Sequence, residues 1–465
     1  MTAGRRVRRL SDGEATFAYQ HALLRGTTQV TTCVTFAAPV EPAALRRAVP
    51  VWAARFAALS VRIEEGRDGL WFRESAGVAP EQLVVAEAGP EESADLLLRR
   101  ELNDLLVTGG PLWRLRAAVR PDGVRQLFFT RNHAVSDGYT AGILLRGLLA
   151  ELYGGAGAAS AAPLLPSADD LTYRPPAPDT GGGADTDTDT DTDTAAAARA
   201  AGSAASATAP VAGPPVPFAA TAPWPERGAD FLPLVLTAGE SARVLGHCRA
   251  DGLTVNEFFA TALAEAFAGA TGRAETDFFT AVSLRRRYTQ AAAYADPGCL
   301  IGVVRSPLRL DGDTFAADAL TYRAAFRAAD AAWRPGARPH AAIRAAVVGL
   351  GEAAASPGIC ITNVGVLDPL LGPYADRLTD IRTVVNRTAA NYNVVLHLST
   401  FQGRFGLALA YGTPSVDPAV VARTHRSLAA RAVSPDGCGL PRAAAGPPSG
   451  AAGTVPPAVP VARAR

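Results

Sequence analysis

Apolar and polar positions alternate along this chain in two blocks, about 10–174 and 222–438, and each block mixes the two periods that separate strands from helices. Within 42–58, apolar residues such as Leu45 and Trp52 recur at helical spacing, which predicts an amphipathic helix. The other elements expected in the first block are strands at 30–36, 112–119 and 124–130 and a helix at 140–153.

The second block alternates in the same way. Thr254 and Glu257 stand three residues apart before an apolar run, which is typical of a capping box at a helix start. Asp417 followed by Pro418 indicates another helix start. The expected helices are 240–250, 254–268, 314–333, 341–355 and 418–431, and the expected strands are 278–283, 300–308, 358–362, 393–400 and 405–411. Strands mixed with helices in both blocks predict a layered α/β fold.

Two stretches break this pattern. Residues 175–221 contain three consecutive glycines, five consecutive Asp-Thr pairs and an Ala/Ser/Pro-rich run, so little there can be buried to offset chain entropy. We therefore expect an N-terminal lobe at 1–174, a flexible low-complexity linker at 175–221, a C-terminal lobe at 222–440 and a disordered tail at 441–465.

Composition narrows the classes of function. The net charge of +1 gives no electrostatic footprint for binding nucleic acid or an anionic membrane. All 45 basic residues are arginine, which excludes a P-loop and a Schiff-base lysine because both need Lys. No apolar run of about 18 residues without charges is present, so no membrane span is expected.

The cysteines and histidines carry no metal pattern. An odd, scattered set of cysteines is typical of reduced thiols in a cytoplasmic protein, and no secretory signal follows the N-terminal arginines; the five are Cys33, Cys248, Cys299, Cys360 and Cys438. Five histidines show no metal-ligand spacing and are interpreted as structural or surface residues, namely His21, His247, His340, His397 and His425. We expect no metal, and neither a GxSxG nor an HExxH motif is present.

The sixth histidine, His133, lies in a polar stretch between an expected strand and an expected helix. It is followed by three small residues and then by Asp137 and Gly138, so an HxxxDG motif stands at a strand-to-helix junction. One interpretation is a general base at a strand end. The other is a hydrogen-bonded histidine at a sheet edge, with Asp137 capping the next helix.

His133, Asp137 and Gly138 match a core motif of the chloramphenicol-acetyltransferase-like superfamily, which the chain resembles. The resemblance is greatest to the polyketide-associated acyltransferases and the stand-alone nonribosomal-peptide condensation domains. The matching segments in both blocks are 10–14, 254–266, Val282-Ser283-Leu284-Arg285 and Ile361-Thr362-Asn363-Val364-Gly365. The linker falls at the crossover between the family's two halves. The residue before the motif is often a second His in the family, and here it is Asn132.

The resemblance implies an α/β fold of two similar lobes that form a V-shaped cleft, with a tunnel that reaches His133 from both faces. It implies His133 as general base, Gly138 as an oxyanion donor, and a structural ion pair between Asp137 and Arg285. Residues expected to line the tunnel are Asn132, Ser283, Thr362 and Asn363. Arg286 and Arg287 are either part of a solvated loop or a clamp for donor phosphates.

Three functions stay open at this point. The first is an acyltransferase that moves an acyl group from a CoA or carrier-protein thioester to a hydroxyl or amine, in natural-product or lipid biosynthesis. The second is a free-standing condensation enzyme that forms an amide between carrier-bound substrates, and the third is a non-catalytic carrier-docking protein. We expect no tightly bound cofactor, since the thioester is a co-substrate supplied in trans, and we expect a monomer.

Overall fold

Five strands form the first sheet of the computed structural model, which describes residues 4–75, 77–154, 162–176, 215–288, 296–310 and 314–435. Their order is β14-β2-β7-β6-β5, with bounds Leu378–Val385, Val30–Val40, Gly123–Arg131, Trp113–Arg120 and Leu83–Glu87. Helices α2 (Pro42–Arg55) and α4 (Gly138–Tyr153) pack against this sheet through a core that contains Trp52, Trp113 and Phe129. Leu98 and Leu102 of α3 (Ala94–Asn103) belong to a separate core that also takes in residues of both large sheets.

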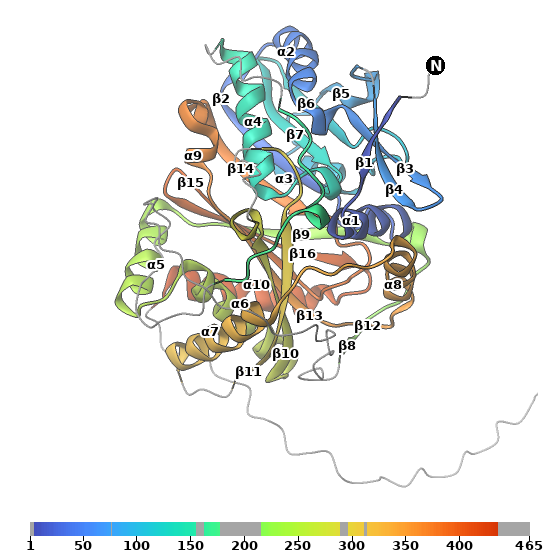
Figure 1. The fold of residues 1–465 in the computed structure, drawn as a ribbon. Helices are drawn as coiled ribbons and strands as arrows, with labels where there is room; N and C mark the ends of the chain where they lie inside the picture. Colours follow the sequence, from blue (N-terminus) through green and yellow to red (C-terminus); the bar gives the residue numbers. More distant parts are fainter. Residues whose placement is uncertain are drawn as a thin grey trace, which may run out of the picture.

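Six strands form the second sheet, in the order β11-β10-β13-β15-β16-β9. Their bounds are Ile301–Arg309, Glu275–Ser283, Gly358–Val366, Val395–Phe401, Arg404–Thr413 and Gly228–Val235. Helices α5 (Ala238–Ala250), α6 (Val255–Thr271), α7 (Phe315–Ala332) and α10 (Pro418–Val433) lie together with this sheet in the lower part of the molecule (Figure 1). The capping box at Thr254 and the N-cap at Asp417 are both formed as the sequence predicts.

Smaller elements complete the fold. A three-stranded sheet contains β1 (Arg6–Arg9), β4 (Gly69–Glu74) and β3 (Val61–Gly66), and β8 (Val216–Pro217) pairs with β12 (Ala355–Ser356). Helix α1 (Asp12–Leu23) and helix α8 (His340–Glu352) share a core with β4, and α9 (Asp368–Leu371) packs near α4. The short 3-10 turns are η1 (Ala57–Leu59), η2 (Pro80–Gln82), η3 (His133–Val135), η4 (Ala168–Asp170), η5 (Trp224–Glu226), η6 (Arg285–Arg287) and η7 (Gly372–Arg377). The α/β fold of two lobes expected from the sequence is confirmed.

One strand crosses between the lobes. Strand β14 lies within the second half of the sequence, yet it pairs with β2 in the first sheet, and Figure 1 shows its orange ribbon beside the blue one. The first sheet therefore contains one strand from beyond the division expected at 175–221. The expected linker is also too long, because Val216–Pro217 forms β8; its residues 177–214 and the expected tail at 441–465 lie outside the described residues.

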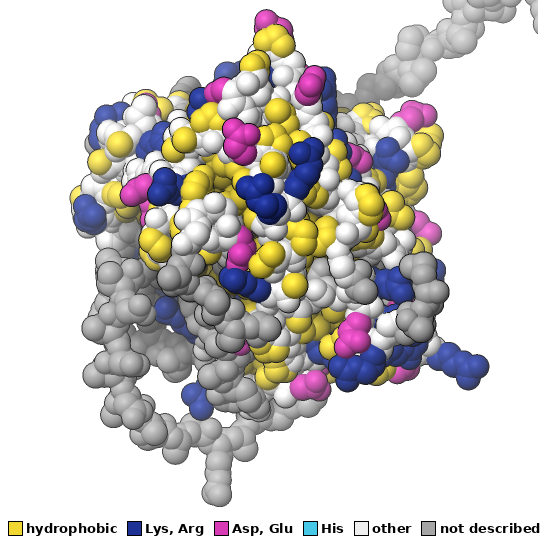
Figure 2. Space-filling model, turned by 90° about the horizontal axis from the view of Figure 1, so that it is seen from above, with side chains coloured by type: hydrophobic (Ala, Val, Ile, Leu, Met, Phe, Trp, Pro, Cys, Tyr) yellow, Lys and Arg dark blue, Asp and Glu magenta, His cyan; other side chains and the backbone are white. Residues whose placement is uncertain are grey.

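Charges of both signs are distributed over the face drawn in Figure 2, where Arg and acidic side chains stand among hydrophobic ones. This arrangement agrees with the net charge of +1 and shows no large area of one sign on that face. Among the helices of the described residues, none has the length and apolar character to cross a membrane.

Candidate active site

The end of β7 places His133 where the two lobes meet. The strand stops at Arg131, and Asn132 then caps the single turn η3 by accepting a hydrogen bond from the Ala134 N–H at 3.0 Å. The N–H of Ser136 donates to the His133 carbonyl at 3.2 Å and closes the turn. Asn132 is buried, so its role here is to hold the turn and it does not line a cavity.

The imidazole of His133 is held from one side and free on the other. The ring of Phe17 on α1 stacks on it with centroids 4.3 Å apart and an angle of 13° between the planes. Its Nδ1 faces the sulfur of Cys299 at 3.8 Å. No hydrogen bond from a described residue reaches Nε2, so this nitrogen is available to accept a proton from a ligand.

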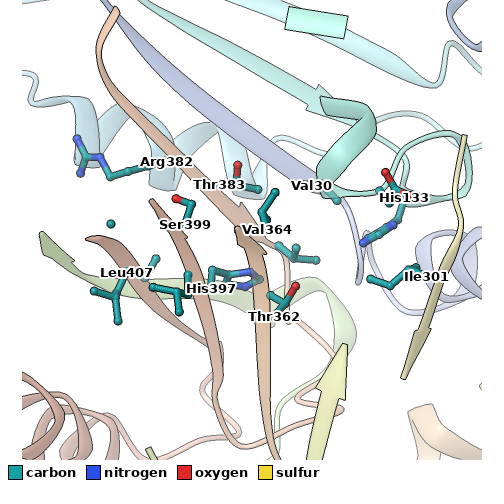
Figure 3. Close-up of a pocket in the computed structure, with 16 residues that line it drawn as sticks. Val30, His133, Ile301, Thr362, Val364, Arg382, Thr383, His397, Ser399 and Leu407 are labelled. Atoms are coloured by element: carbon teal, nitrogen blue, oxygen red, sulfur yellow. The ribbon is translucent and has the colours of Figure 1, made fainter. Parts of the chain in front are cut away.

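His133 forms part of the walls of two cavities. The larger has a volume of about 520 Å³ and lies toward α1 and residues 333–338, and the smaller has about 40 Å³ and lies toward β15 and β16. His133 shares both walls with Ile301, Thr362 and Val385. In Figure 3, His133 points into the smaller cavity opposite Thr362 and His397, which come from the second sheet. A ligand in either cavity can therefore reach the same imidazole.

Burial and neighbouring cations keep this imidazole neutral. Burial, as the largest cause, and the guanidinium groups of Arg131 and Arg387 together lower the pKa of His133 to about 4. Asp137 acts weakly in the opposite direction. A histidine that is neutral at pH 7 can serve as a base without first losing a proton.

Asp137 is turned away from His133 and toward Arg285, with which it forms a buried ion pair. Arg285 donates through Nε and Nη2 to the two Asp137 oxygens at 3.2 Å each, and the two side chains expose 1% and 6% of their surface. The Asp137 carboxylate also caps α4 by accepting from the Thr140 N–H at 2.7 Å, and it accepts from the Leu300 N–H at 3.2 Å. No hydrogen bond joins Asp137 to His133 within the described part of the chain. Asp137 therefore fixes the lobes relative to each other at the motif.

Gly138 opens helix α4 beside the smaller cavity. As the first helical residue it has an N–H without an intrahelical acceptor, at the positive end of the helix dipole. A Cβ at this position would lie 2.8 Å from Val364 Cγ2 of β13, so the close approach of the two lobes requires glycine here.

Of the residues expected to line the tunnel, only Thr362 lines either cavity. The side chains of neighbouring strand residues point to opposite faces, so Thr362 and Val364 face the cavity while Asn363 faces away and accepts from the Gly365 N–H. Ser283 lies at the exposed end of β10. Arg287, one of the arginines considered as a phosphate clamp, pairs with Asp330 at 2.8 Å.

Of the five histidines interpreted as structural or surface residues, His397 lines a cavity of the site. The side chains of His21, His340 and His425 contact backbone carbonyls, as structural residues do. His397 is buried on β15, lines the smaller cavity, and has an Nε2 without a hydrogen-bond partner among the described residues. Burial, the nearby Arg387 and His133 keep its pKa well below the usual value. Nothing in the spacing of His397 along the sequence could have shown this position.

The remaining titratable groups form no metal site within the described residues, where no cluster of three or more His, Cys, Asp or Glu is placed to hold an ion. Four of the cysteines are buried free thiols, and Cys438 lies outside the described residues.

Two lobes joined by a crossover strand, with an HxxxDG motif between two cavities, define the class of the fold. No family model matches the sequence, and no curated protein matches it either. Solved structures do match over nearly the whole chain, and they show that the protein has the chloramphenicol-acetyltransferase-like fold.

Polyketide synthase associated protein 5 from Mycobacterium tuberculosis is 15% identical with a TM-score of 0.59, over 93% of this chain and 99% of that one. The first condensation domain of the calcium-dependent antibiotic synthetase is 16% identical with a TM-score of 0.60, over 92% and 98%. A trichothecene 15-O-acetyltransferase from Fusarium sporotrichioides is 12% identical with a TM-score of 0.64, over 92% and 94%. At these identities the likeness concerns the fold.

Proposed function

We propose that the protein transfers an acyl group from a thioester to a hydroxyl or amine acceptor, with His133 as the general base. The observation that carries the proposal is the position of His133, whose ring lies in the walls of two cavities and whose Nε2 has no hydrogen-bond partner among the described residues. A docking protein without catalytic activity gives no reason for such an imidazole to be held by Phe17 and kept neutral.

The proposed reaction uses both cavities. The smaller cavity takes the thioester end of a pantetheine arm, which is supplied by acyl-CoA or by a carrier protein. The larger cavity takes the acceptor. The acceptor oxygen or nitrogen attacks the thioester carbonyl carbon while its proton passes to His133 Nε2. The resulting tetrahedral oxyanion is stabilised by the Gly138 N–H at the start of α4. Collapse of the intermediate breaks the carbon–sulfur bond, and the thiolate takes the proton from His133.

In this mechanism Asp137 and Arg285 are positioning residues. Asp137 pairs with Arg285 and also accepts from the Leu300 N–H. The Thr140 hydroxyl bonds to both the carbonyl and the N–H of Gly298, so the loop that carries the motif is joined to the segment Gly298–Leu300. The lobes are then fixed at the spacing that leaves both cavities open to His133.

The test is an incubation of the pure protein with a panel of acyl-CoA and acyl-carrier thioesters, combined with free alcohols, free amines and carrier-bound amines. Intact-mass spectrometry of the products identifies the donor and the acceptor together. His133→Ala is expected to lower transfer by about 10²- to 10⁴-fold, because this is the usual contribution of a positioned base. Transfer by that variant at near wild-type rates would contradict the assignment, and product formed only with two carrier-bound substrates would favour the condensation reaction.

A further inference from the structure

The wall of the larger cavity contains a buried cation that has no carboxylate partner among the described residues. Arg387, just after β14, exposes 8% of its surface and lines this cavity together with His133. No ion pair or side-chain hydrogen bond joins its guanidinium to any described residue, and its Nε is buried without a hydrogen-bond partner. The nearest group of note is the ring of Tyr392, whose centroid lies 5.6 Å from the guanidinium carbon.

The two other arginines buried near the site donate hydrogen bonds to described side chains, although Nη2 of Arg131 also has no partner among the described residues. Arg285 pairs with Asp137, and Arg131 donates to Ser136 Oγ at 2.9 Å and Thr32 Oγ1 at 3.0 Å. The two acidic residues of the same cavity, Asp12 and Asp169, are used by backbone N–H groups, since Asp12 accepts from Arg338 and Asp169 accepts from Asp12. Arg387 is therefore the buried arginine of this cavity wall, and its guanidinium has no hydrogen bond to any described residue.

The backbone around Arg387 is held by hydrogen bonds and by close packing. Its neighbour Asn386 donates through Nδ2 to the Leu102 carbonyl at 3.0 Å and accepts from the Thr388 N–H at 2.9 Å. The Arg387 carbonyl accepts from the Ala390 N–H at 2.8 Å and lies so close to Gly412 that a Cβ there would be 2.4 Å away. Because this backbone is fixed, binding a ligand needs to order only the Arg387 side chain and not the segment that carries it.

A second unpartnered group lies beside it. The Oδ1 atom of Asn391, a residue that is 7% exposed and lines the same cavity, has no hydrogen-bond partner among the described residues. It can accept a hydrogen bond from an O–H or N–H of the molecule that Arg387 binds. A buried charge without a partner destabilises a fold, so its presence in a cavity wall is accounted for by a ligand of opposite charge.

We propose that the co-substrate in the large cavity carries a carboxylate that pairs with Arg387, and a hydroxyl or amino group that reaches Asn391 or His133. This inference rests on the proposed function for the identity of the site and adds the chemical class of its acceptor, a hydroxy acid or an amino acid. Arg suits a carboxylate because its planar fork can bind both oxygens at once. A phosphate of the thioester donor would offer the same charge, so the experiment separates the two.

The experiment measures binding and needs no turnover. Thermal shift and titration calorimetry are run on wild type, Arg387→Gln and Arg334→Gln, the last being an exposed arginine of the same cavity. The probes are three matched pairs: 3-hydroxybutyrate and 3-hydroxybutyramide, phenylalanine and phenylalaninamide, and 4-hydroxybenzoate and 4-hydroxybenzamide. Free CoA serves as the phosphate probe.

We expect wild type and Arg334→Gln to bind at least one carboxylate in preference to its amide. We expect Arg387→Gln to lose that preference through a weakening of the carboxylate complex on the order of 10- to 100-fold. Without ligand, Arg387→Gln should melt at or above the wild-type temperature, because the unpartnered cation is gone. A fall in the melting temperature, an equal preference in Arg387→Gln, or no preference in wild type would overturn the proposal.

Loss of CoA binding alone in Arg387→Gln would assign the cation to the donor and would also overturn it. The failure of the proposed function looks different, because His133→Ala keeps the carboxylate preference whether or not transfer occurs.

Discussion

Gly138 and Val364 meet across the boundary between the lobes, the first at the start of α4 and the second on β13. A Cβ on Gly138 would lie 2.8 Å from Val364 Cγ2 and 3.1 Å from Cγ1. Both residues line the smaller cavity, so their contact sets how closely the motif approaches the second sheet.

Gly138→Ala is therefore expected to destabilise the protein by about 1–3 kcal/mol through overpacking and to lower the transfer rate. Gly138→Ala combined with Val364→Ala should regain most of the lost stability, because the valine methyl groups are the atoms in conflict. Denaturant unfolding of the two single variants and the double variant checks this. Equal losses in the single and double variants would show that the conflict lies elsewhere.

Removing either partner of the ion pair between Asp137 and Arg285 is expected to lower the free energy of unfolding. Asp137→Asn leaves a buried guanidinium without its carboxylate, and Arg285→Gln leaves a buried carboxylate without its guanidinium. Each substitution should therefore lower stability by about 3–5 kcal/mol. The double variant should lose less than the sum of the two. Thermal and denaturant melts of all three variants measure the coupling, and strictly additive losses would mean that the two side chains act independently.

The pH dependence of transfer should follow the lowered pKa of His133. The base must be neutral, and its pKa lies near 4 in the folded protein, so kcat/KM should stay constant from neutral pH downward and fall only as the pH approaches about 4. An unperturbed histidine would lose activity near pH 6.5. The profile is measured with circular dichroism at each pH to confirm folding, and a midpoint near 6.5 would contradict the prediction.

The free energy of unfolding should depend on His397 between pH 7 and pH 5, with a defined sign. Its pKa is lowered on folding, so the unfolded chain binds the proton more readily, and this residue's contribution makes the folded state less stable as the pH falls below about 6.5. His397→Asn should therefore show a smaller loss of unfolding free energy between pH 7 and pH 5 than wild type. Parallel curves for the two proteins would rule out this role for His397.

A monomer should be sufficient for activity. The cavities draw His133 from the first half of the chain and Thr362 and His397 from the second, so one chain contains both sides of the site. Light scattering at assay concentration should give the mass of one chain. Mixing His133→Ala with Arg285→Gln should restore no activity, whereas recovery would mean that sites are shared between chains.

Local patterns were enough to predict most regular elements and the motif itself. The alternation at 124–130 and 405–411 corresponds to β7 and β16, and the capping box at Thr254 opens α6. Strand β14 was not predicted, because Asp380 and Arg382 interrupt its apolar pattern. Their charges are tolerated only because Arg382 pairs with Asp380 at 2.7 Å and also with Asp95 of α3, far away in sequence.

The site shows the same limit. Arg285 lies opposite Asp137 in the structure, as the family resemblance implied, although 148 residues separate them. Arg387 and His397 belong to no motif, and they reach the site only because β14 and β15 pass close to His133. The family resemblance predicts that Asn363 and Ser283 line the tunnel. Strand alternation instead turns Asn363 away from the cavity, and Ser283 lies at the exposed end of β10.

The position of β14 also bears on how the polypeptide is made. During synthesis the ribosome releases β2, β7, β6 and β5 long before residues 378–385 are translated, so β2 waits as the open edge of an unfinished sheet. Its sequence, VTTCVTFAAPV, carries no charge and is the kind of edge that pairs with other chains. The first lobe therefore has an edge open to aggregation until β14 is translated and pairs with β2.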